Sequence, residues 1–548
     1  MTAEFAAGPD KEGPVTFGQL NMLEWITANS DHPDTVLRWT FPLPAGVTAA
    51  DVARAFALLA RRHEILRTTY PAGSPPRQRV RGSGEVPVEV HTVDGPVDAE
   101  AAAGMLRTRI SGHAFDLEKE PPLRVTVAEH DGQAVACVAA FSHVAVDLRA
   151  MLILDAEFRS ALAGAPAGRT PHQPLDQVAD EQHGEGRRKA LASLERWERL
   201  LRAMPSGVYA GTGRPVSAEL RSPAAAAALR AAAERAKAGR TSVVLAALCA
   251  CHSRYAGRPR CVLTTLAGNR VDLRTSGYVG PLVQTGAIAV DTRGATFDEL
   301  CHRAWHALLE AEAHGLYDPL RLREIADRIE HERGMLLNFE PFFNGMLDET
   351  SPPGGHRPPG AGAPPESRLV WTGMGEGTAP VRFDLTEADA ELRLHLWSAG
   401  PAPLSRDQVA AFLHAVEALI VAAGREDLTP ERMAEIAGPP LVRRDAGWTR
   451  IGPSWVDTVR VQAMLDAALP GLGQVFTRAR GRELVAYLKA TEDIRGPEAA
   501  HTRCMAELPG RAATMTPSYY VLFDRLPADP RDLHEWEKGE VRAEGTGR

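Results

Sequence analysis

The sequence has no excess of positive charge and no long apolar run. Its formal net charge is −8 over 548 residues, whereas binding of nucleic acid without sequence preference needs concentrated Lys and Arg. No stretch approaches the roughly 18 uninterrupted apolar residues typical of a transmembrane helix. The first residues, MTAEFAAGPDKEG, lack the basic start and apolar run of a signal peptide. These absences predict a cytoplasmic protein that binds neither nucleic acid nor a membrane.

Cysteine is scarce, and its spacing matches no zinc finger. Cys249 and Cys251 lie two residues apart in an expected helix, so they point in different directions. Glu310 and His314 have a metal-like spacing, but no second His completes a zinc motif. We therefore expect free thiols and no bound metal. The six cysteines are Cys137, Cys249, Cys251, Cys261, Cys301 and Cys504.

The remaining composition is that of a globular protein. Hydrophobic residues make up 44% and charged residues 24% of the chain, and its length predicts about three or four globular units. We place domain boundaries at 1–175, 176–440 and 441–548. The Pro- and Gly-rich stretch 346–368 is expected to be a surface loop.

Hydrophobic periodicity predicts several helices and strands. A continuous apolar run favours a buried strand, and Ser or Thr before a periodic segment favours a helix start. The expected helices follow Thr16, cover Ala49 to His63, Ala150 to Leu162 and Arg187 to Met204, open at Ser222-Pro223, and begin at Thr241; the expected strands include Gln133 to Phe141 and Leu392 to Leu396.

A polar cluster stands where the apolar strand 133–141 ends and the next helix begins. Its sequence is FSHVAVDLRAM. His143 is a residue type that gains or loses a proton near neutral pH, and Asp147 lies four residues further on. Strand ends combine a rigid scaffold with access to a cleft. By themselves, these residues do not distinguish a catalytic histidine from a structural one.

Seven segments along the chain carry recognisable motifs. They are TFGQLNMLEW (Thr16 to Trp25), RHEILRT (Arg62 to Thr68), FDLEKEPPLR (Phe115 to Arg124), SHVAVDL (Ser142 to Leu148), LAGNRVDLRTSGYVGPLVQT (Leu266 to Thr285), MLLNFEPF (Met335 to Phe342) and VRFDLT (Val381 to Thr386). In this order they resemble the motifs of the condensation domains of nonribosomal peptide synthetases. The segment SHVAVDL aligns with that family's active-site motif, His-His-x-x-x-Asp-Gly.

The resemblance implies an α/β (α+β) fold. Two chloramphenicol-acetyltransferase-like lobes would form a V-shaped pseudo-dimer, with a crossing helix in the second lobe and a tunnel between the lobes. Donor and acceptor carrier proteins would present their phosphopantetheine arms at opposite mouths of this tunnel. The reaction would be acyl transfer from a carrier-bound acyl or aminoacyl thioester to an amine or hydroxyl, with no bound cofactor.

The resemblance also assigns roles to residues. His143 aligns with the second His of the motif and would take the acceptor's proton or position the acceptor. Asp147 aligns with the motif's Asp, which the family pairs with an Arg that aligns with Arg270. A buried Asp without its cation is a costly charge, so we assign Asp147 and Arg270 to site architecture.

The chain departs from the family motif at several positions. Ser142 replaces the first His, as in the similar fungal cyclising condensation domains, and we assign it to site architecture. Leu148 replaces Gly and is expected to line and narrow the channel. Pro281 and Gln284 stand where an aromatic residue and Asn are usual.

Residues 448 to 536 resemble the small C-terminal subdomain of adenylation enzymes. RELVAYL (Arg482 to Leu488) and TMTPSYYVLFDRLP (Thr514 to Pro527) carry this resemblance. Leu533 stands near the position of that family's catalytic Lys, and Lys538 lies too far along to replace it. The chain also lacks a Gly-rich phosphate loop. We therefore expect an appendage that packs on the acyltransferase or docks a partner.

Two alternatives to the acyltransferase hypothesis remain at this point. One is a catalytically silent, condensation-like platform that recruits a carrier protein or a tailoring enzyme. The other is an enzyme that uses a soluble acyl-CoA in place of a carrier thioester.

Overall fold

The structure, a computed structural model, describes most of the chain. The residues outside the description are 96–97, 111–113, 166–167, 206–212, 338, 340, 346–365, 374–380, 401–402, 440–443 and 479–482. Most of the expected surface loop at 346–368 therefore lies outside the described residues. None of the described helices combines the length and apolar character needed to cross a membrane.

The described residues form two compact units. Unit 1 comprises Met1–Leu194, Ala267–Gln284 and His314–Pro319, and unit 2 comprises Glu195–Leu266, Thr285–Ala313 and Leu320–Arg548. Three segments of the expected 176–440 domain, residues 176–194, 267–284 and 314–319, thus fold within unit 1. The expected C-terminal piece, 441–548, falls within unit 2.

Unit 1 is built around a five-stranded sheet of order β1-β6-β7-β8-β3. Only the β6–β7 pair is parallel, and the other neighbours are antiparallel. A small sheet, β2-β5-β4, lies apart from it. The strands are β1 (Thr2–Ala6), β2 (Lys11–Pro14), β3 (Val36–Phe41), β4 (Thr68–Thr69), β5 (Arg77–Val80), β6 (Ser83–Thr92), β7 (Leu123–His130) and β8 (Gln133–Ser142).

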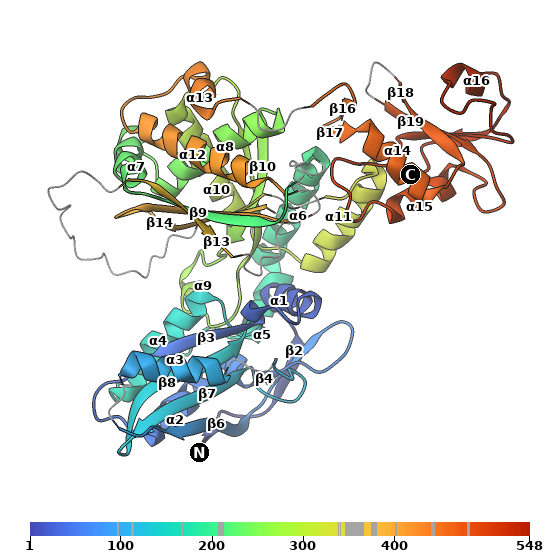
Figure 1. Cartoon of the computed structure of the whole chain (residues 1–548). Coiled ribbons are helices and arrows are strands. Elements are labelled where there is room, and N and C mark those ends of the chain that lie inside the picture. The colour runs from blue at the N-terminus through green and yellow to red at the C-terminus, as the bar shows by residue number, and fades with distance from the viewer. Residues whose placement is uncertain are drawn as a thin grey trace. The chain divides into compact units, whose positions relative to one another are not determined.

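Helices cover both faces of this sheet (Figure 1). Successive side chains of a strand point to opposite faces, and β8 is apolar on both. Cys137, Ala139 and Phe141 face helices α2 and α4, whereas Ala136, Val138 and Ala140 face helix α3. The continuous apolar run that predicted a buried strand is explained by this double coverage. The helices that cover the sheet are α2 (Ala49–Arg62), α3 (Ala99–Ile110) and α4 (Leu148–Leu162). Unit 1 also contains α5 (Pro174–Gln182), α9 (Leu273–Ser276) and the first part of α6 (Gly184–Ala203), whose residues from Glu195 on belong to unit 2.

Helix α1 (Phe17–Ala28) begins with the capping expected from its sequence. Thr16 and Gln19 form a reciprocal capping box. The helix packs closely on the segment Ala267–Gln284, because a Cβ placed on Gly18 would stand 1.9 Å from the carbonyl oxygen of Pro281. Only a residue without a side chain permits this approach.

Unit 2 contains a seven-stranded sheet of order β11-β10-β12-β14-β15-β9-β13. Helices α7, α8, α10 and α12 cover one of its faces (Figure 1). Leu392, Leu394 and Leu396 alternate on β15 and face these helices, which confirms the predicted strand. The strands are β9 (Val216–Ser222), β10 (Arg260–Ala267), β11 (Gln284–Asp291), β12 (Phe342–Asn344), β13 (Arg368–Thr372), β14 (Val381–Glu387) and β15 (Leu392–Ser398); the helices are α7 (Pro223–Ala236), α8 (Arg240–Ala256), α10 (Phe297–Ala313), α11 (Pro319–Arg333), α12 (Arg406–Ala423) and α13 (Pro430–Ala437).

The C-terminal part of unit 2 contains a hairpin and a separate four-stranded sheet, β18-β19-β20-β21. The sequence pattern suggested an end near residue 536, but β21 follows it, because an exposed polar edge strand such as VRAEG has no apolar alternation. The elements are β16 (Trp448–Ile451), β17 (Ser454–Asp457), α14 (Thr458–Ala468), β18 (Gly473–Arg478), β19 (Glu483–Lys489), α15 (Pro497–Ala506), β20 (Tyr519–Phe523), α16 (Leu533–Glu537) and β21 (Val541–Gly545).

Gly18→Ala is expected to destabilise the protein, because its new methyl group collides with backbone atoms. Overpacking of this kind costs about 1–3 kcal/mol. The free energy of unfolding, measured by urea titration, tests this. Gly277→Ala is the matched control, since a Cβ at Gly277 meets nothing within 4 Å. Equal stability of the two variants would contradict the tight contact.

Candidate active site

His143 lies in the turn between β8 and α4, and its ring is oriented by a local contact. Its Nδ1 is 2.8 Å from the carbonyl oxygen of Val146. Because a carbonyl only accepts hydrogen bonds, Nδ1 carries a hydrogen, and in the neutral imidazole the lone pair is then on Nε2. The His143 amide also donates to the carbonyl of Thr35 at 3.0 Å. The backbone and ring of His143 are thus fixed in the form that accepts a proton at Nε2.

Trp25 of α1 is the aromatic neighbour of His143. The two rings meet edge to face, with centroids 6.1 Å apart, and His32 contacts the same indole at 5.2 Å. Trp25 is half-buried. In the sequence, Trp25 stands out only as the last residue of the motif TFGQLNMLEW, with nothing to place it beside His143. Helical periodicity gives no signal for such a contact, since 118 positions separate the two residues in sequence.

Asp147 is buried, and its carboxylate binds backbone amides and a cation. Its side chain is 3% exposed. Oδ1 accepts from the Ala150 amide at 2.8 Å, which makes Asp147 the N-cap of α4. Oδ2 accepts from the Leu282 amide at 3.1 Å. The helix therefore begins at Leu148, two residues earlier than the apolar pattern suggested.

Arg270 completes the binding of Asp147. Its Nη2 lies 2.8 and 3.0 Å from the two carboxylate oxygens. The same guanidinium donates to the carbonyl oxygens of Thr275, Tyr278 and Gly280. The ion pair thus joins α4 to the segment Ala267–Gln284, all within unit 1. The structure brings together the two residues that the resemblance pairs.

Ser142 and Leu148 flank the His143–Asp147 segment in different environments. Ser142 is 2% exposed at the end of β8, whereas Leu148 is 38% exposed at the first position of α4. Gln284, which replaces the family's Asn, is buried and binds the backbone of Tyr317 through both ends of its amide. Each substitution therefore has a distinct structural setting.

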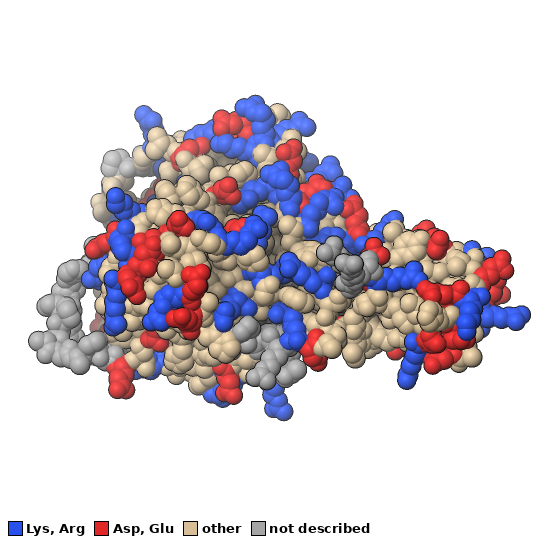
Figure 2. All heavy atoms as spheres, turned by 90° about the horizontal axis from the view of Figure 1, so that it is seen from above, with Lys and Arg blue, Asp and Glu red and all other residues tan. Residues whose placement is uncertain are grey.

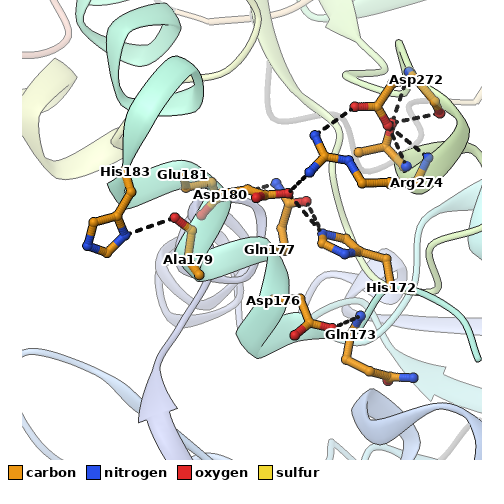
Figure 3. Close-up of polar contacts among 11 residues, drawn as sticks. His172, Gln173, Asp176, Gln177, Ala179, Asp180, Glu181, His183, Asp272 and Arg274 are labelled. Carbon is orange, nitrogen blue, oxygen red and sulfur yellow. Dashed lines mark hydrogen bonds and ion pairs between the residues drawn. The ribbon is translucent and has the colours of Figure 1, made fainter.

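Helix α5 supplies a second polar cluster in unit 1, shown in Figure 3. Asp180 lies 2.8 Å from Arg274 and 3.5 Å from His172. Gln177 bridges the His172 ring and Glu181, at 3.1 and 3.0 Å. These contacts join α5 to the segment that carries Arg270.

Glu181 is the most perturbed carboxyl of this cluster. It is 2% exposed, and its Oε2 accepts from the amide of Phe17, the first residue of α1, at 2.8 Å. Burial raises the pKa of Glu181 to about 8, and hydrogen bonds from Gln177 and Phe17 only partly oppose this. The carboxyl is thus largely protonated at neutral pH. The sequence analysis did not single out Glu181, because its polar surroundings resemble an exposed helix.

Other residues considered in the sequence have structural settings. His63 is 1% exposed, and its Nε2 lies 2.6 Å from Glu157. His395 and Trp397 share a face of β15, with ring centroids 4.3 Å apart. The six cysteines are buried and form no disulfide. Among the described residues, no three His, Cys, Asp or Glu side chains gather as a metal site.

The Condensation domain family matches residues 14–351. The chain belongs to the condensation-domain family. Its relatives include the phosphinothricin tripeptide synthetase PhsC of Streptomyces viridochromogenes, 25% identical over 357 residues, which cover 61% of this chain and 32% of PhsC. The chain spans about a third of the length of such relatives.

Solved structures of condensation domains share the fold of this chain. The condensation domain of the Monacolin K polyketide synthase MokA has a TM-score of 0.58 at 16% identity, covering 77% of this chain and 100% of that one. The X-domain from teicoplanin biosynthesis, solved in complex with OxyB, has a TM-score of 0.56 at 19% identity, covering 80% and 98%. These likenesses confirm the predicted α/β, chloramphenicol-acetyltransferase-like class.

Asp147→Asn is expected to destabilise this condensation-domain protein by about 3–5 kcal/mol, since it leaves Arg270 buried without its counter-charge. Asn still caps a helix as well as Asp does. Urea unfolding of Asp147→Asn measures the loss. Asp457→Asn, at the N-cap of α14, is the control and is expected to change stability by less than about 1 kcal/mol. A loss at Asp147 no larger than at Asp457 would refute the role of the ion pair.

Glu181→Gln is expected to flatten the pH dependence of stability. The folded state holds a proton on Glu181 up to about pH 8, whereas the unfolded state releases it near the ordinary pKa of 4.5. Wild-type stability therefore falls as pH rises through this window, by at most about 1.4 kcal/mol per pH unit. Because its amide does not titrate, the stability of the variant relative to the wild type increases from pH 5 to 8. Melting temperatures across this range test the prediction, with the exposed Glu185→Gln as control; identical pH profiles for Glu181→Gln and wild type would contradict it.

Proposed function

We propose that the chain is a condensation-type acyltransferase of natural-product biosynthesis. It would join a carrier-bound acyl or aminoacyl thioester to an amine or hydroxyl acceptor. The observation that carries the proposal is the state of His143: a half-buried imidazole whose Nδ1–H is bound to Val146. Membership in the condensation-domain family supports this assignment.

In this mechanism, Nε2 of His143 takes the proton of the acceptor as the acceptor attacks the thioester carbonyl. A carbon–nitrogen or carbon–oxygen bond forms, the carbon–sulfur bond then breaks, and the proton leaves with the thiol. General-base help of this kind is worth about 10²–10⁴ in rate. The indole of Trp25 covers one side of the His143 ring by its edge-to-face contact. An acceptor would therefore approach His143 from another side.

Asp147 has a positioning role in this proposal. Its two oxygens already bind Arg270, the Ala150 amide and the Leu282 amide. Because its oxygens are already engaged, we assign Asp147 to positioning the segment that carries His143. Ser142, which is buried, and Arg270 complete the architecture, and the exposed Leu148 would line the acceptor's channel.

The substrates are proposed by chemical class. Carrier proteins would deliver the donor, and in some cases the acceptor, on phosphopantetheine arms, and a small amine or hydroxyl compound would serve as a free acceptor. Such chemistry needs no bound cofactor or metal.

A second candidate function is a silent platform that recruits a carrier protein or a tailoring enzyme. The changes at Ser142 and Leu148 favour it, because both alter the motif around His143. The X-domain solved in complex with OxyB shows that a protein of this fold binds a partner enzyme.

His143→Ala is expected to lower product formation by about 10²–10⁴ while leaving the fold intact, because the ring is half-buried and forms no ion pair with any residue that the structure describes. The assay uses loaded carrier proteins encoded beside this chain, a panel of amines and alcohols, and intact-protein mass spectrometry. His414→Ala, at an exposed histidine, is the control.

The outcomes of this assay separate the hypotheses. Equal product from wild type and His143→Ala would overturn the acyltransfer mechanism. Binding of carrier proteins without any turnover by the wild type would favour the platform. Turnover of acyl-CoA in preference to carrier thioesters would favour a soluble acyl donor.

A further inference from the structure

Four arginine side chains lie near one another in unit 2. They come from three elements that are distant in sequence: the end of α8, the end of α11 and the β16–β17 hairpin with the residues before it. Figure 2 shows Lys and Arg side chains interspersed with Asp and Glu on one face of the molecule. The four are Arg258, Arg333, Arg444 and Arg450.

Arg444 is held in place by aromatic rings and backbone. Its guanidinium carbon lies 5.0 Å from the ring centre of Trp455 and 5.7 Å from that of Trp448. Its Nη2 donates to the carbonyl oxygens of Tyr255 and Ala256 at 3.3 and 3.4 Å. The side chain is therefore ordered before any ligand arrives.

Gly257, which precedes Arg258, has no side chain and so leaves room for the Arg444 guanidinium and the Trp455 indole. It ends α8 in the left-handed conformation, with φ of 61°. A Cβ at this position would stand 3.3 Å from both Arg444 Nη1 and Trp455 Nε1. The backbone before Arg258 is thus bordered by a guanidinium and an indole N–H.

Several donors of this cluster are buried and have no acceptor within the part of the chain that the structure describes. They are Arg258 Nη2, Arg444 Nε and Trp455 Nε1. Arg258 is only 8% exposed. Leaving a buried donor unpaired is costly. All three groups donate and none accepts, so the missing partner must be rich in acceptors.

The positive charge of the cluster is also uncompensated. Within the described ranges, none of the four arginines forms an ion pair with Asp or Glu. Burial and the neighbouring Arg450, Arg333 and Arg444 lower the pKa of Arg258 to about 10. Burial, with Arg202 and Arg548, lowers the pKa of Arg333 to about 10. By contrast, Arg460 of α14 is paired with Asp457 at 3.3 Å.

We propose that this arginine cluster binds the phosphate group of a small phosphate-bearing molecule. A phosphate offers several acceptor oxygens and about two negative charges, which match converging guanidinium groups and an indole N–H. A single carboxylate carries only one negative charge, so it would leave most of the positive charge of the four arginines unmatched. The site lies within unit 2 and goes beyond the proposed acyl transfer, which uses residues of unit 1.

Titration calorimetry of the full chain tests the proposal with four probes: inorganic phosphate, pyrophosphate, adenosine 3′,5′-bisphosphate and 4′-phosphopantetheine. We expect saturable binding of at least one probe at constant ionic strength, with chloride giving no equivalent signal. The probe that binds most tightly identifies the source: free phosphate, a nucleotide or a pantetheine arm. No saturable binding of any probe would overturn the proposal.

Arg258→Met is the decisive variant, because it keeps much of the aliphatic bulk and removes the orphaned charge. We expect at least about a tenfold loss of affinity for the best probe, as for loss of a charge-assisted hydrogen bond. Arg230→Gln, at an exposed arginine of α7 in the same unit, is the control and is expected to bind as the wild type does. Undiminished binding by Arg258→Met would reject the site.

Two measurements keep this result interpretable. Without ligand and at low salt, Arg258→Met should melt no earlier than the wild type, because it removes an uncompensated cation; lost binding is then not due to unfolding. His143→Ala should bind the probe normally. Failure of acyl transfer together with normal phosphate binding would therefore count against the proposed function only. Failure of phosphate binding together with normal acyl transfer would count against the arginine cluster only.

Discussion

The ion pair between Asp147 and Arg270 holds the candidate site of unit 1 together. A carboxylate that is 3% exposed is tolerable only when its charge and lone pairs are matched. Here one side chain caps α4, binds the Leu282 amide and meets a guanidinium that itself holds three carbonyl oxygens. The turn that carries His143 is therefore fixed at its helical end. Gly18 allows α1, which carries Trp25, to pack closely on the segment Ala267–Gln284 that also carries Arg270.

Three buried ionisable groups in this protein meet the same physical problem in different ways. Asp147 is neutralised by a cation from a distant segment. Glu181 keeps its proton, since its neighbours donate too little to offset burial. Arg258 has neither remedy, because Arg cannot release its proton near neutral pH and its strongest charged neighbours are other arginines. The ion pair of Asp147 holds the candidate site together, and the retained proton of Glu181 makes stability depend on pH. The unpaired charge of Arg258 leaves a place where an anion can bind.

The sequence predicted much of the local structure. Apolar runs and capping residues located α1, α2, α7 and β8 to within a few residues, because such signals act between neighbours in the chain. The ordered motifs predicted the fold class, and they also named Asp147 and Arg270 together. That pairing came from the resemblance, since 123 positions separate the two residues. Local pattern missed the role of Asp147 as a helix cap, and so placed the start of α4 two residues late.

The sequence by itself determined which segments are helical or extended and the family to which the chain belongs. It also singled out His143 as the candidate active-site histidine. Only the tertiary structure decided the tautomer of that imidazole, the protonation of Glu181 and the convergence of Arg258 with Arg333 and Arg444. The reason is physical. Periodicity and capping depend on residues a turn apart, whereas burial and electrostatic fields depend on every group within several ångströms, whatever its position in the chain.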